Sequence, residues 1–318
     1  MPQTEGHKQH IGAVIAPGNY DGVHRGHQVL LERARAMADR FGVGTRVVTF
    51  YPHPAALLAP EQAPETLTPP ERRRELLLGY GVDEVEVVEF TREYAAQTPR
   101  EFIERMRAGG ARGFVVGHDF RFGRRAQGDT AFLQTVGQEE GFAVDVVDPV
   151  LDHVTHPALR ISSTAVRDAL RAGAVREATM LLGRVYDIAG EVVRGDQRGR
   201  LLGFPTANLH GGAAMHPDDG VYAVAVRRLA VASDAPLLWG VANLGKRPTF
   251  AAGRSVEVHL LDFDAAIYGE TLRIGFVARI RGEQRFDGVD ALKAQIMRDC
   301  DSARAVLATA EQRELRWI

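Results

Sequence analysis

The chain has 318 residues, of which 45% are hydrophobic and 25% charged, as is ordinary for a folded globular protein. A formal net charge of −2 gives no reason to expect a nucleic-acid or acidic-membrane partner, and a single cysteine, Cys300, excludes an internal disulfide and a cysteine-based zinc site. No apolar run approaches the length of a membrane span, and residues 1–10 are polar, so we expect a cytoplasmic protein.

Up to about residue 183, apolar runs of strand length alternate with helical patterns. This alternation is typical of βαβ units and predicts an α/β domain with a doubly wound, mostly parallel, Rossmann-like sheet. Residues 51–70 carry six prolines, which predicts a long loop over the ligand-binding edge of the sheet. The predicted strands are 11–16, 45–50, 84–90, 113–117 and 142–147, and the predicted helices are 28–41, 70–79, 99–108, 129–140 and 165–172.

The pattern changes near residue 185. Runs that alternate with period two, or are short and apolar, are now separated by Gly, Asp and Pro, and one helical pattern follows at 288–310. This succession predicts a small antiparallel β-barrel with a terminal helix. The predicted domains are residues 1–183 and 184–318. The predicted barrel strands are 186–194, 220–229, 237–244, 255–263 and 271–281.

Residues 18–27 read Gly-Asn-Tyr-Asp-Gly-Val-His-Arg-Gly-His, between the first predicted strand and the first predicted helix. In open α/β sheets phosphate groups bind at this point, against unpaired helix N–H groups. His24 and His27 could face a nucleoside triphosphate there, and Gly26 would let its phosphates approach the backbone. The His-x-Gly-His signature resembles nucleotidyltransferases that move an AMP or CMP group onto an acceptor phosphate or carboxylate. A metal site at the two histidines is a weaker alternative, because no other ligand pair is spaced to complete it.

Three further polar segments follow predicted strands, so the sheet should gather them at the same edge. They are Thr-Phe-Tyr-Pro-His-Pro at 49–54, Gly-His-Asp-Phe-Arg-Phe-Gly at 117–123 and Ile-Ser-Ser-Thr-Ala-Val-Arg at 161–167. The hydroxyls of Ser163 and Thr164 at a helix start, with Arg167 one turn later, predict a clamp for a leaving pyrophosphate. A plain helix cap is the alternative.

The barrel half carries a second set of groups suited to a nucleotide. Gly195, Gly199 and Gly203, at steps of four, form a loop able to wrap phosphates with backbone N–H groups, although hairpin turns are the alternative. Thr206 and Asn208 point the same way in an extended segment and make a weak oxygen site for Mg²⁺ on a nucleotide. Glu257 projects from a predicted strand, either as a general base toward an alcohol or as a solvated carboxylate on the outside of the barrel.

Together these motifs resemble the bacterial bifunctional riboflavin kinase/FMN adenylyltransferase (FAD synthetase) family across nearly the whole chain. The resemblance implies that the barrel phosphorylates riboflavin to FMN with ATP. The N-terminal domain would then join FMN to the AMP part of a second ATP, giving FAD and pyrophosphate. In the barrel half the resemblance is carried by Gly-Phe-Pro-Thr-Ala-Asn at 203–208, which is highly specific, and by the runs at 220–223, 240–245, 247–250, 257–260 and 268–269.

The resemblance also assigns roles to residues. In the kinase domain Thr206 and Asn208 would hold Mg²⁺–ATP within the loop of Gly195, Gly199 and Gly203, and Glu257 would be the base toward the ribityl 5′-hydroxyl. In the other domain His24 and His27 would stabilise the transition state at the α-phosphate. The residues assigned to ATP there are Gly18, Tyr20, His24, Gly26, His27, Asp119, Ser163, Thr164 and Arg167, and those assigned to flavin are Phe50, Pro52, His53 and Phe122.

Some of these assignments have alternatives in the residues themselves. Phe50 and Phe122 are nearly as well explained by core packing, and His53 by a solvated loop position. Tyr20 stands where the family usually has Phe, which keeps the ring. Asp187 stands where a small polar residue is usual.

Two other functions fit parts of the pattern. The N-terminal domain could use another acceptor, such as a sugar or vitamin phosphate, with the barrel as an accessory. The chain could also bind flavin in a regulatory role without turnover. The 204–208 run and Glu257 argue against the first, and the intact His24 and His27 argue against the second. The expected partners are riboflavin, FMN and ATP, with Mg²⁺ as cofactor and no obligate protein partner.

Overall fold

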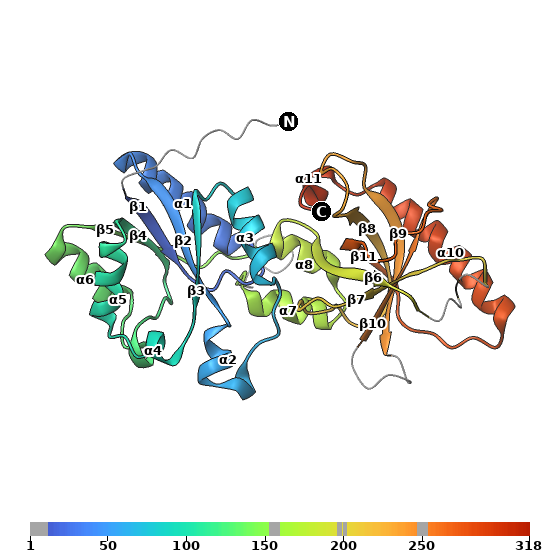
Figure 1. Cartoon of the computed structure of the whole chain (residues 1–318), viewed down its shortest axis with the longest axis horizontal. Coiled ribbons are helices and arrows are strands. Elements are labelled where there is room, and N and C mark those ends of the chain that lie inside the picture. The colour runs from blue at the N-terminus through green and yellow to red at the C-terminus, as the bar shows by residue number, and fades with distance from the viewer. Residues whose placement is uncertain (1–11, 153–159, 196–198, 200–201, 247–253) are drawn as a thin grey trace. The chain divides into compact units, whose positions relative to one another are not determined.

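The structure is a computed structural model that describes residues 12–152, 160–195, 199, 202–246 and 254–318 (Figure 1). It divides into two compact units, Met1–Ser162 and Ser163–Ile318. The domain boundary at residue 183 remains a prediction. The two helices at 163–171 and 175–182 belong to the same unit as the barrel, because the second of them packs on barrel strands.

The first unit contains the predicted parallel sheet, with the strand order β3-β2-β1-β4-β5. All five predicted strands are present, with bounds shifted by at most two residues. They are β1 (Ala13–Pro17), β2 (Gly44–Tyr51), β3 (Glu84–Glu89), β4 (Ala111–Gly117) and β5 (Ala143–Val147).

Helices cover both faces of this sheet. The chain runs from β1 through β2 to β3 at one edge, and then returns to β4 and β5 on the other side of β1. Because crossovers between parallel strands are right-handed, α1 and α3 lie on one face and α5 and α6 on the other (Figure 1). The helices are α1 (Arg25–Phe41), α2 (Pro54–Leu58), α3 (Pro70–Gly79), α4 (Arg92–Ala95), α5 (Pro99–Ala108) and α6 (Thr130–Glu140), with short 3₁₀ turns η1 (Pro60–Gln62) and η2 (Arg124–Ala126).

Local sequence signals explain where these helices begin. Thr98 accepts a hydrogen bond from the Glu101 N–H (3.2 Å), and the Glu101 carboxylate accepts one from the Thr98 N–H (2.7 Å). This capping box, with Pro99 in the first helical position, fixes the start of α5. The Pro-rich segment 51–70, predicted as a loop, contains the short α2 and η1 instead. His53 caps α2 by accepting a hydrogen bond from the Ala55 N–H (3.1 Å).

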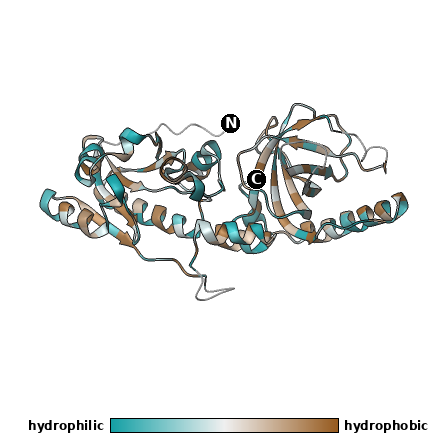
Figure 2. Cartoon of the chain, turned by 90° about the horizontal axis from the view of Figure 1, so that it is seen from below, coloured by the Kyte–Doolittle hydropathy of each residue, from teal (hydrophilic) through white to brown (hydrophobic). Residues whose placement is uncertain are grey.

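The second unit begins with α7 (Ser163–Arg171) and α8 (Val175–Leu182), and then forms a closed antiparallel barrel in the order β10-β7-β6-β11-β8-β9. Hydrophobic residues line its strands (Figure 2). Ala303 and Leu307 of the terminal helix pack into the core with Val221 and Val277. The elements are β6 (Tyr186–Val193), β7 (Ala207–His210), β8 (Gly220–Arg228), β9 (Leu238–Lys246), β10 (Arg254–Leu260), β11 (Thr271–Arg281), α10 (Val289–Ala308) and α11 (Gln312–Leu315).

No helix in the described parts of the chain combines the length and the apolar composition needed to cross a membrane.

Candidate active sites

The His-x-Gly-His run forms the first turn of α1. The helix begins at Arg25, three residues before the predicted start at Gln28. His24 is therefore the N-cap, and its Nδ1 accepts a hydrogen bond from the His27 N–H (3.3 Å). The N–H groups at a helix start have no partners within the helix, and the helix dipole is positive there. The two imidazoles thus flank a place where a phosphate group can bind.

The two histidine rings are stacked, with centroids 3.6 Å apart. Gly26 permits this arrangement, because a Cβ at that position would lie 3.1 Å from two atoms of the His24 ring. The Tyr20 ring packs beside His27, with centroids 4.9 Å apart, and a Cβ at Gly18 would lie 3.1 Å from it. The structure therefore brings Gly18, Tyr20, His24, Gly26 and His27 together in one loop and turn.

Tyr20 is 1% exposed, and burial raises the pKa of its phenol. Its hydroxyl has no hydrogen-bond partner within the described residues. The Tyr20 hydroxyl is thus a buried polar group that none of the described residues satisfies.

The strand order places this loop at the topological switch point of the sheet. The order reverses between β1 and β4, and ligands of open α/β sheets bind at the carboxyl ends of such strands. The loop after β1 carries the histidines, and the loop after β4 carries Asp119. The sequence prediction that both loops leave the same edge is confirmed by the parallel pairing of β1 with β4.

Asp119 is half exposed and pairs with Arg160, whose Nη2 lies 2.7 Å from its carboxylate. Partial burial acts to raise the pKa of Asp119, but the hydrogen bond and the charge of Arg160 outweigh it, with a contribution from His118, so that the pKa is lowered. Asp119 is therefore held as a carboxylate with a neighbouring cation. Its assignment to ATP remains a prediction.

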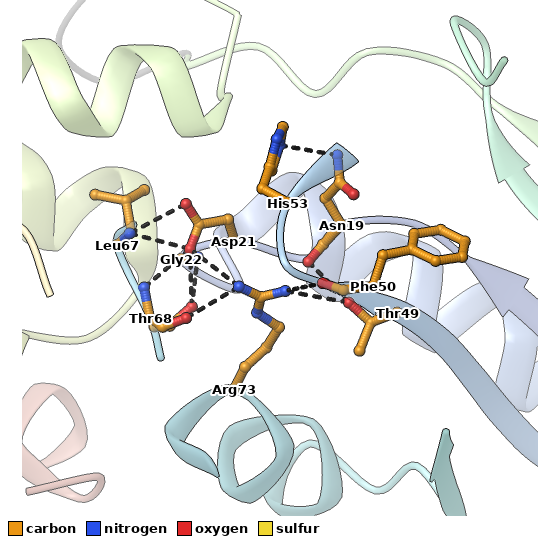
Figure 3. A network of polar contacts seen from close by, with 9 residues as sticks. All are labelled: Asn19, Asp21, Gly22, Thr49, Phe50, His53, Leu67, Thr68 and Arg73. Atoms are coloured by element: carbon orange, nitrogen blue, oxygen red, sulfur yellow. Dashed lines mark hydrogen bonds and ion pairs between the residues drawn. The ribbon is translucent and has the colours of Figure 1, made fainter. Parts of the chain in front are cut away.

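The four residues assigned to flavin fall into two groups. Phe50 and Phe122 belong to the core of the first unit, where Phe122 stacks on Phe120 with centroids 5.3 Å apart. Core packing, the alternative for both, is what the structure shows, and their contact with flavin remains a prediction. Pro52 is exposed, and His53 is partly buried, with Nε2 3.1 Å from the Asn19 side-chain amide (Figure 3). His53 is thus tied to the loop after β1 rather than free in solvent.

Ser163, Thr164 and Arg167 lie at the start of α7, in the second compact unit. The helix begins at Ser163, earlier than the predicted start at 165, so both hydroxyl residues are in its first turn. Thr164 is exposed, Ser163 is partly buried, and Arg167 is 6% exposed. Their role as a pyrophosphate clamp remains a prediction.

The barrel aligns the candidate kinase residues in one row. Glu257 of β10 is paired with Asn208 of β7 on one side and with Asn243 of β9 on the other. Directly opposed residues in antiparallel strands share a face, with Cβ atoms roughly 5 Å apart. Val256, Val258 and Leu260 fill the core, so Glu257 lies on the opposite face of β10, partly exposed. This pairing places a carboxylate between two amide side chains.

The glycines of the loop make room for Thr206 and Asn208. A Cβ at Gly195 would lie 2.5 Å from the Asn208 amide, and one at Gly199 would lie 3.3 Å from the Thr206 hydroxyl. Gly203 has φ +89°, a conformation that glycine adopts readily. His259 holds the adjoining segment to β10, because its Nδ1 donates to the Pro205 carbonyl (2.8 Å). The Thr206 hydroxyl and the Asn208 amide oxygen are oxygen ligands of the kind that a hard divalent cation prefers.

Sequence reasoning missed two features of this site. The strand β7, which carries Asn208, was not predicted, because four residues show little alternation. Asn243 lay within a family run but received no role, and only the strand register reveals its position beside Glu257. The Arg-Pro-Thr-Phe run at 247–250 lies outside the described residues.

Comparisons with known proteins match each half of the chain to a family. The family model described as FAD synthetase matches residues 6–165, and the one described as riboflavin kinase matches residues 182–307. The chain is similar to the bifunctional riboflavin kinase/FMN adenylyltransferase of Escherichia coli strain K12, with 42% identity and 92% of each chain covered. Its similarity to the protein of the same name from Pseudomonas fluorescens is 41% identity, with 96% of each chain covered.

A solved structure gives the same result for the fold. The crystal structure of a protein from Streptococcus pneumoniae, described as a macrolide-efflux protein, matches with a TM-score of 0.82 and 32% identity, and covers 94% of this chain and 97% of that one. The efflux name belongs to that protein alone, whereas both family models and both curated relatives are named for flavin enzymes. The chain therefore belongs to the bifunctional riboflavin kinase/FMN adenylyltransferase family.

Proposed function

We propose that the chain makes FAD from riboflavin in two ATP-dependent steps. The barrel phosphorylates riboflavin to FMN, and the N-terminal unit transfers the AMP group of a second ATP to FMN and releases pyrophosphate. The observation that carries the proposal is that one chain combines a histidine pair at a helix N-terminus with a carboxylate set between two amides on a separate barrel. Two transfers of different phosphates need two such sites.

In the kinase step Glu257 acts as the general base. Its carboxylate accepts the proton of the ribityl 5′-hydroxyl as the oxygen attacks the γ-phosphorus of ATP, and ADP leaves. Its position on a rigid strand supports this role, because a base must be held within hydrogen-bond reach of its proton. Asn208 and Asn243 stand opposite it on the two neighbouring strands.

Thr206 and Asn208 would hold a divalent cation with the nucleotide, for which we propose Mg²⁺. The donor set supports this, since a hydroxyl and an amide oxygen leave several positions for phosphate oxygens and water, as Mg²⁺ prefers. The cation supplies neutralisation of the charge on the transferred phosphate. Gly195 and Gly199 leave space beside both donors, and the loop that contains them is proposed to cover the phosphates of ATP.

In the adenylyl step a phosphate oxygen of FMN attacks the α-phosphorus of ATP, and pyrophosphate leaves from the opposite side. His24 and His27 donate hydrogen bonds to the α-phosphate oxygens as negative charge accumulates there, and the first N–H groups of α1 add to this stabilisation. Asp119, Ser163, Thr164 and Arg167 are proposed to bind ATP, and Phe50, Pro52, His53 and Phe122 to contact flavin. These two assignments rest on the family pattern.

The test is direct. The protein is incubated with riboflavin, ATP and Mg²⁺, and riboflavin, FMN and FAD are resolved by chromatography over time. FMN should rise first and FAD should follow, and EDTA should stop both steps until Mg²⁺ is restored. Failure to consume ATP with either riboflavin or FMN would contradict the proposal. Tight flavin binding without any product would favour the regulatory alternative instead.

A further inference from the structure

A network of buried polar groups lies behind the adenylyltransferase loop (Figure 3). Asp21, Thr49, Thr68 and Arg73 are each 4% exposed or less. They come from three segments that are far apart in the sequence: the loop after β1, the end of β2, and α3 with the residues just before it. None of the four residues was assigned a role from the sequence.

Asp21 ties the loop after β1 to the segment that leads into α3. Its carboxylate accepts hydrogen bonds from the Leu67 N–H (3.0 Å), the Thr68 N–H (2.9 Å) and the Thr68 hydroxyl (3.2 Å). The Gly22 N–H donates in turn to the Thr68 hydroxyl oxygen (2.9 Å). Residues 21 and 22, just before Val23 and His24, are therefore both hydrogen-bonded to the Leu67–Thr68 segment.

Arg73 joins this loop to the end of β2. One terminal nitrogen of its guanidinium donates to the Thr49 hydroxyl and to the Phe50 carbonyl (both 3.3 Å). The other donates to the Thr68 carbonyl (3.0 Å) and lies 3.6 Å from the Asp21 carboxylate. Thr49 in turn contacts the loop after β1, because its hydroxyl donates to the Asn19 carbonyl (3.0 Å).

We propose that Arg73 is a positioning residue for adenylyl transfer, a role that rests on the proposed function of this unit. It acts through Asp21 and Thr49 on residues 18–24, and so sets where His24 and the start of α1 lie. Without Arg73 the buried carboxylate of Asp21 loses the guanidinium that lies 3.6 Å from it, and losing a cation beside a buried charge is unfavourable unless the loop moves to let water in. Transfer reactions that depend on placement lose rate when groups shift by about 1 Å.

The same chain supplies the controls. Arg73→Met should lower kcat for the conversion of FMN to FAD by about 10–100-fold, with a much smaller change in KM for ATP and an unchanged kinase step. Arg73→Lys keeps the charge but not the fork of donors, so it should recover part of kcat. Arg74→Met, an exposed neighbour on the same helix, should leave both activities at the wild-type level.

A double variant separates positioning from general damage. Asp21→Asn combined with Arg73→Met removes both charges of the Arg73–Asp21 ion pair. Its loss in kcat should therefore be smaller than the product of the two single losses. Multiplicative losses, or an Arg73→Met protein whose kcat per folded molecule equals that of the wild type, would overturn the inference.

If Arg73→Met does not fold, a second variant tests the same proposal. Thr49→Val then removes only the hydroxyl that links Arg73 to the Asn19 carbonyl, and it should lower kcat for FAD formation while the protein stays folded by circular dichroism. An unchanged kcat in that variant would overturn the inference. A wild-type chain that makes no FAD from FMN would instead refute the proposed function itself.

Discussion

The side-chain amide of Asn208 lies directly against Gly195, where a Cβ atom would approach it to 2.5 Å. Gly195→Ala should therefore push Asn208 out of its place opposite Glu257. We expect the kinase rate to fall by about 10–100-fold, as is usual when a positioned group is displaced, while FMN is still converted to FAD.

Gly282→Ala is the matched control for this variant, because its Cβ would meet no atom closer than 3.9 Å. Both steps are followed by chromatography. Equal kinase rates in the two variants would show that the space beside Asn208 is not needed.

Glu257→Ala should stop the sequence of reactions at riboflavin. Loss of a general base costs about 10²–10⁴-fold in rate, whereas the adenylyltransferase site is unaffected. Supplied FMN should still yield FAD at the wild-type rate. A variant that phosphorylates riboflavin normally would show that another group accepts the proton.

His27→Ala should have the opposite effect and cause FMN to accumulate. Removing one donor that stabilises charge in a transition state typically lowers the rate by about 10²–10³-fold. The riboflavin kinase rate, measured in the same sample, reports the amount of folded barrel. FAD formation at the normal rate would remove His27 from the reaction.

Tyr20→Phe should stabilise the first unit. The buried hydroxyl has no partner within the described residues, and leaving such a group unpaired costs about 1–3 kcal/mol. The temperature at which FAD formation is half inactivated should rise, and the rate at low temperature should be retained.

Tyr186→Phe provides the contrast, measured by thermal inactivation of the kinase step. The Tyr186 hydroxyl is buried and donates to the Met215 carbonyl (2.6 Å), so its loss should lower that temperature. If Tyr20→Phe proved as destabilising as Tyr186→Phe, the Tyr20 hydroxyl would have to be making a bond after all.

Much of the fold follows from local sequence signals. The predicted bounds of α3 and α5 coincide with those in the structure, because each begins with proline in the first turn and α5 has a capping box. The start of α1 was placed too late, since histidine is not among the usual N-cap residues. The strand β7 was missed because it has only four residues and is defined by its neighbours β6 and β10.

The sites could be predicted only as far as their motifs reach. The histidine pair and the Thr206–Asn208 pair lie within short runs, so their residue types and spacing reveal them. Asn243 is paired with Glu257, and Arg73 contacts residues distant in the sequence. These relationships are set by strand register and by the meeting of three segments, which no short run of sequence reveals. Phe50 and Phe122 are aromatic residues of the type that could stack on a flavin ring, but their rings also pack in the core of the first unit, so residue type alone does not distinguish the two roles.

The closure of the barrel has a consequence for aggregation. Within the described residues its six strands pair all the way round, with no unpaired edge for another chain to extend. The parallel sheet, in contrast, ends in β3 and β5. The edge strand β3 carries three charged residues, Glu84, Glu86 and Glu89, which oppose pairing with another strand, whereas β5 carries one, Asp145. In a heat-stressed, partly unfolded population, intermolecular strand pairing would therefore begin at β5.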